Sequence, residues 1–184
     1  MGSRESTVTM YIALLRGINV GGKNRLPMSD LITVLKSLGY EDIRTYIQSG
    51  NVVFSSKRKI GEDEDDRISG AISAEKGFRP KVILLTAEQL REAIENNPFA
   101  ADEGKTLHLF FLDSPPKNPD LERLHSLKTA SEEFTLQGRI LYLYAPDGLG
   151  RSRLAATIER SLGVSATARN YNTISKLASM ADVS

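Results

Sequence analysis

The residue types that bind small anions are concentrated in one segment, residues 16–24, which reads RGINVGGKN. Glycines let a backbone approach a ligand closely, and Arg, Lys and Asn side chains supply hydrogen-bond donors. The segment lies where a strand must turn towards a helix. We therefore expect at least one of Gly17, Gly21 and Gly22 to have a positive φ. No catalytic constellation accompanies these donors, so the segment predicts binding and does not define a reaction.

Residues 17–24 read G-x-x-x-x-G-K-N, which differs from a phosphate-binding P-loop at the last position. The P-loop needs Ser or Thr after the lysine because that hydroxyl ligates magnesium, and Asn24 is a poor substitute. The next strand is also expected to pair through a hairpin, whereas P-loop folds use crossovers to parallel strands. The segment is thus either a turn that requires glycine or a pocket wall for another polar or anionic ligand.

A second set of cations and amides lies at residues 167–177, which read TARNYNTISKL. Helical spacing places Asn172, Thr173 and Lys176 away from the apolar face of the predicted helix, with Arg169 just before its start. Backbone N–H groups at a helix start are unpaired and favour anions. Asn170 is also a suitable N-cap, which would leave the segment with a structural role alone.

The third distinctive segment, Gln48-Ser49-Gly50-Asn51, is typical of a polar hairpin turn. Gly50 is expected to be structural, because glycine tolerates a positive φ. In a strand-helix-strand-strand unit, we expect the loop at 16–24 and this hairpin to lie near opposite ends of the sheet.

Composition limits the classes of function. The chain has 184 residues and a formal net charge of +1, so no global field favours nucleic acid or membranes. It has no cysteine, which excludes disulfides and thiolate metal sites. His108 and His125 have no acidic spacing that suits a metal, so no metal is expected and the cofactor is undefined. No apolar run of signal or membrane length occurs, so we expect a cytoplasmic protein with no membrane association.

Two successive units of order strand-helix-strand-strand-helix-strand are expected to position these residues. In the first unit we expect strands at 8–15, 43–47, 51–54 and 82–85. We expect one helix at 27–38 and a second that begins in the acidic run at 62–66 and ends at residue 76. The acidic run at 62–66 indicates a solvated first helical turn. A connecting helix at 87–96 follows. In the second unit we expect strands at 106–112, 134–136, 139–144 and 165–168, helices at 120–127 and 153–162, and a last helix at 170–180.

This order predicts an α+β fold of two ferredoxin-like βαββαβ subdomains in tandem, with a linker helix and a C-terminal helix. The expected subdomains span residues 1–86 and 105–184, joined by a linker helix and loop at 87–104. The second subdomain includes the terminal helix.

Three segments in this order, residues 16–24, 45–54 and 167–177, make the chain resemble a largely bacterial family, domain of unknown function 1697. The resemblance extends over nearly the whole chain from Tyr11 onward. It implies an α+β fold with two ferredoxin-like halves, in agreement with the order above. It implies no activity.

We therefore expect an uncharacterised cytoplasmic protein that binds a small polar or anionic ligand, such as a nucleotide or another phosphorylated compound. The residues expected to contact the ligand are Arg16, Asn19, Lys23, Arg169, Asn172 and Lys176. The glycines expected to be structural are Gly17, Gly21, Gly22 and Gly50. Two alternatives are a nucleic-acid-binding module that uses the same cations on phosphates and an interaction protein without catalytic activity. The sequence decides neither the oligomeric state nor whether the protein is an enzyme.

Overall fold

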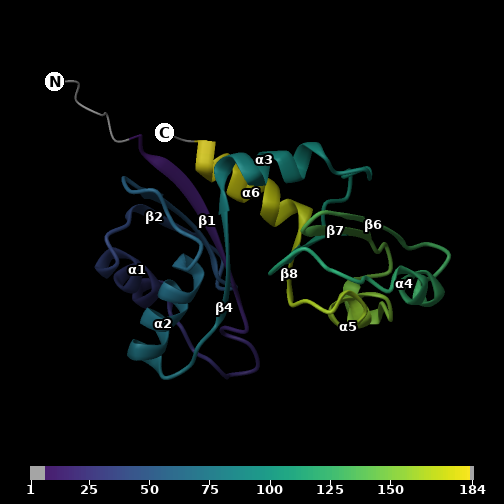
Figure 1. The fold of residues 1–184 in the computed structure, drawn as a ribbon, viewed down its shortest axis with the longest axis horizontal. Helices are drawn as coiled ribbons and strands as arrows, with labels where there is room; N and C mark the ends of the chain where they lie inside the picture. Colours follow the sequence, from purple (N-terminus) through teal and green to yellow (C-terminus); the bar gives the residue numbers. More distant parts are fainter. Residues whose placement is uncertain (1–6, 183–184) are drawn as a thin grey trace. The chain divides into compact units, whose positions relative to one another are not determined.

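The structure of the protein is a computed structural model that describes residues 7–182 (Figure 1). The chain ends of the two expected subdomains, residues 1–6 and 183–184, lie outside the described residues. Two compact units are present, one made of residues 7–92 and 177–182 and the other of Ala93–Lys176. None of the helices within residues 7–182 has the length and apolar character that a membrane span needs.

The first unit contains a four-stranded antiparallel sheet of order β2-β3-β1-β4. Its elements are β1 (Thr9–Arg16), α1 (Met28–Ser37), β2 (Glu41–Tyr46), β3 (Asn51–Ser56), α2 (Glu64–Lys76) and β4 (Lys81–Thr86), followed by α3 (Ala87–Glu95). The central strand β1 pairs with both β3 and β4, and Ile12 lies opposite Val53 and Leu85. The predicted βαββαβ order is confirmed for this unit.

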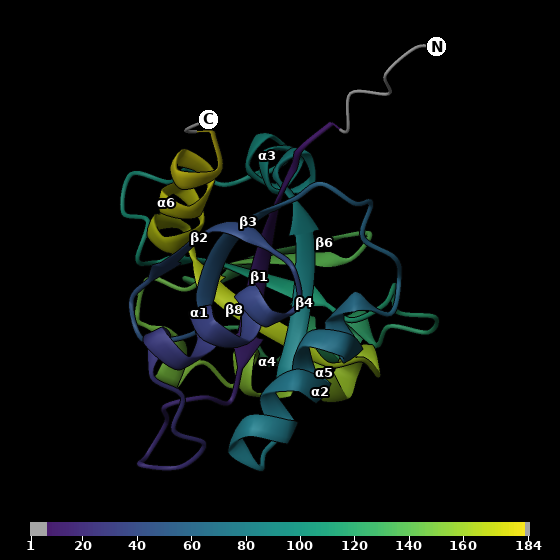
Figure 2. The same ribbon diagram turned by 90° about the vertical axis from the view of Figure 1, so that its left-hand side faces the viewer.

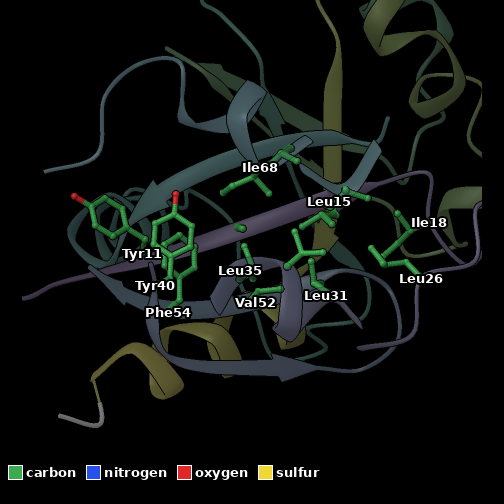
Figure 3. Packing of buried hydrophobic residues seen from close by; sticks show 14 residues of the cluster. Tyr11, Leu15, Ile18, Leu26, Leu31, Leu35, Tyr40, Val52, Phe54 and Ile68 are labelled. Carbon is green, nitrogen blue, oxygen red and sulfur yellow. The ribbon is translucent and has the colours of Figure 1, made fainter. Parts of the chain in front are cut away.

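Helices α1 and α2 cover one face of this sheet, and the core between them is apolar (Figures 1 and 2). Leu31, Val34 and Leu35 recur at helical spacing and are buried, which explains why α1 packs with this face inward. Gly77 follows α2 in the left-handed conformation at φ 77°, as expected for a glycine that ends a helix. Figure 3 shows the side chains of this core.

The second unit repeats the topology, with an antiparallel sheet of order β6-β7-β5-β8. Its elements are β5 (Leu107–Leu112), α4 (Leu121–Leu127), β6 (Glu133–Gln137), β7 (Ile140–Tyr144), the 3-10 turns η1 (Leu149–Arg151) and η2 (Ala155–Thr157), α5 (Ile158–Leu162), β8 (Ala166–Asn170) and α6 (Tyr171–Asp182). Its core includes Phe110, Leu124, Leu141 and Ile158. The α+β fold with two ferredoxin-like subdomains in tandem is confirmed.

The helix predicted over residues 153–162 is wrong in its first half, because α-helix begins only at Ile158. Side chains there bond the local backbone, which competes with a regular helix. Ser152 Oγ accepts a hydrogen bond from Ala155 N at 3.0 Å, and Thr157 Oγ1 donates to Arg153 O at 2.8 Å. These bonds stabilise a 3-10 turn before α5.

Candidate functional site

The glycine-rich segment between β1 and α1 folds as a small β-hairpin. Val20 and Lys23 form an antiparallel bridge, with Lys23 N donating to Val20 O at 3.0 Å. Gly21 and Gly22 between them have φ values of 58° and 74°. Positive φ at both central residues defines a type I′ turn, for which Gly-Gly is a preferred pair. Figure 2 shows this dark purple segment projecting beyond the end of β1.

This geometry differs from that of a P-loop. In a P-loop, successive backbone N–H groups point at a phosphate. Here the N–H groups of Asn19 and Lys23 are bonded within the hairpin, Asn19 N to Asn24 O at 3.0 Å and Lys23 N to Val20 O. An anion at this hairpin would therefore be held mainly by side chains. The prediction that the glycines include positive φ is confirmed for all three, with Gly17 at 78°.

Asn19 braces the base of the hairpin. Its Oδ1 accepts from Leu26 N at 2.8 Å, and its Nδ2 donates to Leu26 O and to Gln48 O, each at 2.9 Å. Both amide hydrogens are thus used within the protein. Ile18 and Leu26 are buried on either side of the hairpin, and Figure 3 shows both at the same end of the core. The structure gives Asn19 a structural role, and its contact with a ligand stays a prediction.

The bond from Asn19 to Gln48 shows that the expected positions of the two loops were wrong. We expected the loop after β1 and the β2–β3 hairpin at opposite ends of the sheet. Both β1 and β2 pair antiparallel with β3, so β1 and β2 run in the same direction. The turn after β2 therefore lies at the end where β1 finishes, and Leu15 N donates to Gly50 O at 2.8 Å.

The β2–β3 turn has a constrained backbone. Gly50 has a φ of 83°, and a Cβ there would lie 2.7 Å from Leu15 Cβ, so the predicted need for glycine is confirmed. Asn51 is fully buried, and its Nδ2 donates to Tyr46 O at 3.1 Å and to Ser49 Oγ at 2.9 Å. Ile47 has a φ of 51°, which is unusual for a β-branched residue, yet its side chain is 54% exposed.

Residues 16–26 and 46–50 together form a surface that we call the basic rim. It contains Arg16, Lys23 and Arg25, all exposed, and no acidic residue. Within residues 7–182, no hydrogen bond or ion pair engages the side chain of Lys23 or Arg25. Val20 and Ile47 add exposed aliphatic surface, with Val20 69% exposed. The basic rim thus offers positive charge and apolar contacts on a braced backbone.

The three predicted site residues of the second unit lie in different settings. Arg169 is on β8, opposite Leu109 of β5, and its Nη1 donates to Ala168 O at 2.9 Å. Burial lowers the pKa of Arg169 to about 10. Asn172 lies on the first turn of α6 against Gly104, where an added Cβ would overlap Asn172 Oδ1. Lys176 is exposed on the same helix, one turn further along.

Asn170 caps the start of α6, as predicted from the sequence. Asn170 Oδ1 accepts from Thr173 N at 2.9 Å, the usual bond between an N-cap side chain and the third helical residue. We placed Thr173 on the polar face of α6, but it is buried at 8% exposure. Its short side chain fits beside the apolar face, where Ile174 and Leu177 are fully buried.

An ionic cluster in the first unit was missed from the sequence. Glu64, at the start of α2, is only 5% exposed, although the acidic run was expected to be solvated. Its carboxylate accepts from Arg58 Nη1 at 3.0 Å and Arg67 Nη1 at 2.6 Å, and from the Tyr40 hydroxyl. Arg58 also lies 5.7 Å from the centre of the Tyr40 ring. The one signal in the sequence was the spacing of Glu64 and Arg67 by three residues.

This environment shifts the acidities within the cluster. Burial alone would raise the pKa of Glu64, but the hydrogen bonds from Arg58, Tyr40 and Arg67 hold it at about 2, below its ordinary value of 4.5. The pKa of the Tyr40 hydroxyl is raised by burial and by its bond to Glu64. Neither group is suited to exchange protons near neutral pH, so we assign the cluster a structural role.

Among residues 7–182, no group of three or more His, Asp or Glu side chains is arranged to hold a metal ion. His108 Nδ1 is buried and has no hydrogen-bond partner there, and burial lowers the pKa of this imidazole.

The family model described as "Protein of unknown function (DUF1697)" matches residues 8–142, which is most of the chain. This chain belongs to the DUF1697 family. A solved structure with a similar fold is that of a conserved bacterial protein from Streptococcus pneumoniae, at a TM-score of 0.70 and 24% sequence identity. The match covers 95% of this chain and 99% of that chain. The comparison with curated proteins gave no significant match. Membership of the DUF1697 family confirms the resemblance and assigns no activity.

Proposed function

We propose that this DUF1697 protein binds a small anionic ligand, a nucleotide or another phosphorylated compound, at the basic rim. The supporting observation is that Lys23 and Arg25 project from a braced hairpin on a surface without acidic residues. Cations on a surface segment that has no acidic residue of its own attract anions. The formal net charge of the chain is only +1, so this attraction is local.

The chemistry of the rim suits a phosphorylated ligand in three ways. The Arg25 guanidinium can bind two phosphate oxygens at once, and the Lys23 ammonium can add a mobile point charge. The methyl groups of Val20 and Ile47 offer contacts to an apolar part of the ligand. The backbone is held by Asn19 and by the type I′ turn, so little ordering is needed on binding.

The same arrangement favours binding over turnover. Cations can stabilise developing negative charge, but a reaction also needs a group that moves protons. The side chains on the rim that contain nitrogen or oxygen are cations, amides, a hydroxyl and a phenol, and the rim has no histidine or carboxylate. Contacts from Arg16, Arg169, Asn172 and Lys176 are predicted from the sequence, and single substitutions at each position test them.

Thermal unfolding with inorganic phosphate, ATP and AMP tests the proposal. A ligand that binds the folded state raises the unfolding temperature in a concentration-dependent way. The double variant Lys23→Ala/Arg25→Ala should lose this shift. Lys36→Ala/Arg151→Ala is the matched control, since it removes one exposed Lys and one exposed Arg elsewhere and should keep the shift.

Two results would contradict a small-ligand site at the rim. The first is an equal thermal shift in the rim variant and the control. The second is tight binding of a single-stranded oligonucleotide whose affinity falls steeply with salt, because that slope reports many phosphate contacts. The second result would favour the alternative of a nucleic-acid-binding module.

A further inference from the structure

The second unit contains a cavity of about 490 Å³. It lies between the loop that leads into β5 and the end of β7, and Phe99, Asp102, Glu103, Thr106 and Tyr144 line it together with Ala100 and Pro146. Ligand pockets in proteins usually measure about 300–1,000 Å³, so this cavity has room for a small organic molecule. None of these residues belongs to the basic rim.

The loop that forms one wall is fixed by its own hydrogen bonds. Thr106 N and Oγ1 both donate to Glu103 O, at 2.8 and 2.7 Å. The Asn97 carboxamide bonds both Phe99 N and Phe99 O. Gly104 O accepts from Tyr171 N at 3.0 Å, which ties the loop to the start of α6. The backbone polar groups named here are thus used, and the ligand-binding capacity of the loop rests on its side chains.

The other wall is set by the sheet. Ala145 N donates to Thr106 O at 2.8 Å, so Thr106, directly before β5, is held beside the end of β7. Tyr144 lies in register with Leu107 on β5 and with Glu133 on β6. Glu133 forms an ion pair with Lys128 at 3.1 Å. Tyr144 therefore lines the cavity from the end of a regular strand.

The chemistry of this cavity is opposite to that of the rim. The cavity lining contains two carboxylates, Asp102 and Glu103, and no cation. In the part of the chain described, neither carboxylate takes part in a hydrogen bond or ion pair. The lining also contains two aromatic rings, Phe99 and Tyr144. Aromatic faces attract cations through the ring quadrupole, and carboxylates add charge-assisted hydrogen bonds.

We propose that this cavity binds a small organic cation, an aliphatic amine, through Asp102 and Glu103 with Phe99 and Tyr144 packing on its alkyl chain. A carboxylate pair favours a doubly charged amine over a singly charged one. A metal ion is a poorer match, because the rings supply no oxygen ligands apart from the Tyr144 hydroxyl. The inference is independent of the proposed function at the basic rim.

Titration of the full-length ¹⁵N-labelled protein with 1,4-diaminobutane tests this assignment by amide chemical shifts. The neutral isostere 1,4-butanediol is the matched ligand control, because it has the same length and no charge. We expect saturable shifts at residues 99–106 and 144–146 with the diamine and none with the diol. The double variant Asp102→Asn/Glu103→Gln should bind the diamine at least about ten-fold more weakly.

Glu75→Gln/Glu122→Gln is the matched protein control, because it removes two exposed carboxylates outside the cavity lining and changes the net charge equally. Its affinity should equal that of the wild type. The variant Tyr144→Leu should also weaken binding while the circular dichroism spectrum stays native. Equal affinity in the Asp102/Glu103 variant and in the control would overturn the proposal. Shifts confined to other residues, or no saturable shift at millimolar diamine, would overturn it as well.

Discussion

Replacing Glu64 by Gln removes a buried negative charge at the centre of the ionic cluster and keeps the size of the side chain. In the wild type, this carboxylate accepts hydrogen bonds from Arg58, Arg67 and Tyr40. The variant leaves two guanidinium groups next to each other without a counter-charge. Breaking a buried ion pair on one side costs more than the pair contributes, because the remaining charge is uncompensated.

The pKa of Glu64 sets the size of the expected effect. Its fall from 4.5 to about 2 corresponds to about 3 kcal/mol of differential stabilisation, at 1.36 kcal/mol per pKa unit. The side chains of Arg58 and Arg67 are 46% and 44% exposed, so water can partly replace the lost contact. We therefore expect Glu64→Gln to lower the free energy of unfolding by about 2–3 kcal/mol. For a chain of this size that corresponds to a fall in Tm of about 5–10 °C.

The destabilisation caused by Glu64→Gln should depend on pH in a defined direction. The folded-state pKa is depressed, so the stabilisation is complete above the unfolded value of 4.5 and is lost as the pH falls towards 2. The difference in Tm between wild type and Glu64→Gln should be largest above about pH 5 and should shrink steadily in acid. Differential scanning calorimetry from neutral pH to acid measures it. Glu62→Gln, an exposed member of the same acidic run, is the control and should change Tm little.

Two observations would refute this reasoning. If Glu62→Gln and Glu64→Gln had the same Tm at neutral pH, the burial of Glu64 would contribute nothing. If the difference between wild type and Glu64→Gln stayed constant down to acid pH, the destabilisation would come from packing and not from charge.

Further substitutions test the loops of both units by urea denaturation. Gly50→Ala should cost at least about 2 kcal/mol, since it combines a positive φ with a 2.7 Å approach to Leu15, whereas Gly21→Ala has open space and should cost about 1 kcal/mol; equal losses would show that the close approach is relieved. Asn19→Ala removes three hydrogen bonds and should cost about 2–3 kcal/mol, and protection of the Leu26 amide from hydrogen exchange should fall; unchanged protection would mean that Asn19 is no brace. Gly104→Ala should destabilise the fold by forcing Asn172 aside, and Gly104→Ala/Asn172→Ala should recover most of the loss; additive losses would contradict the contact.

Local signals predicted the fold well. Glycine and asparagine turns, short apolar runs and helical spacing each depend on a few neighbouring residues, so they placed the strands and most helices. The order of elements then led to two ferredoxin-like units. The helix over 153–162 failed because Ser152 and Thr157 bond the backbone locally, a competition that apolar spacing does not register.

Features that join distant residues could not be predicted in the same way. Glu64 looked like one of several solvated acids, because nothing local reveals that Tyr40 and Arg58 converge on it. Most of the residues that line the cavity lie in the loops before β5 and after β7, where no periodic pattern marks them, and Tyr144 comes from the end of β7. The position of the hairpin turn beside the glycine-rich segment depended on strand direction, which is a property of the sheet and not of either loop.

The left-handed backbone of Ile47 has a consequence for engineering this protein. A strained residue of this kind costs of the order of 1–3 kcal/mol in the folded state, which glycine or asparagine would largely avoid. Replacing Ile47 by glycine or asparagine should therefore stabilise the folded state. A library of variants at position 47, screened in parallel for melting temperature and for ligand binding, would separate the effect of this residue on stability from its effect on binding.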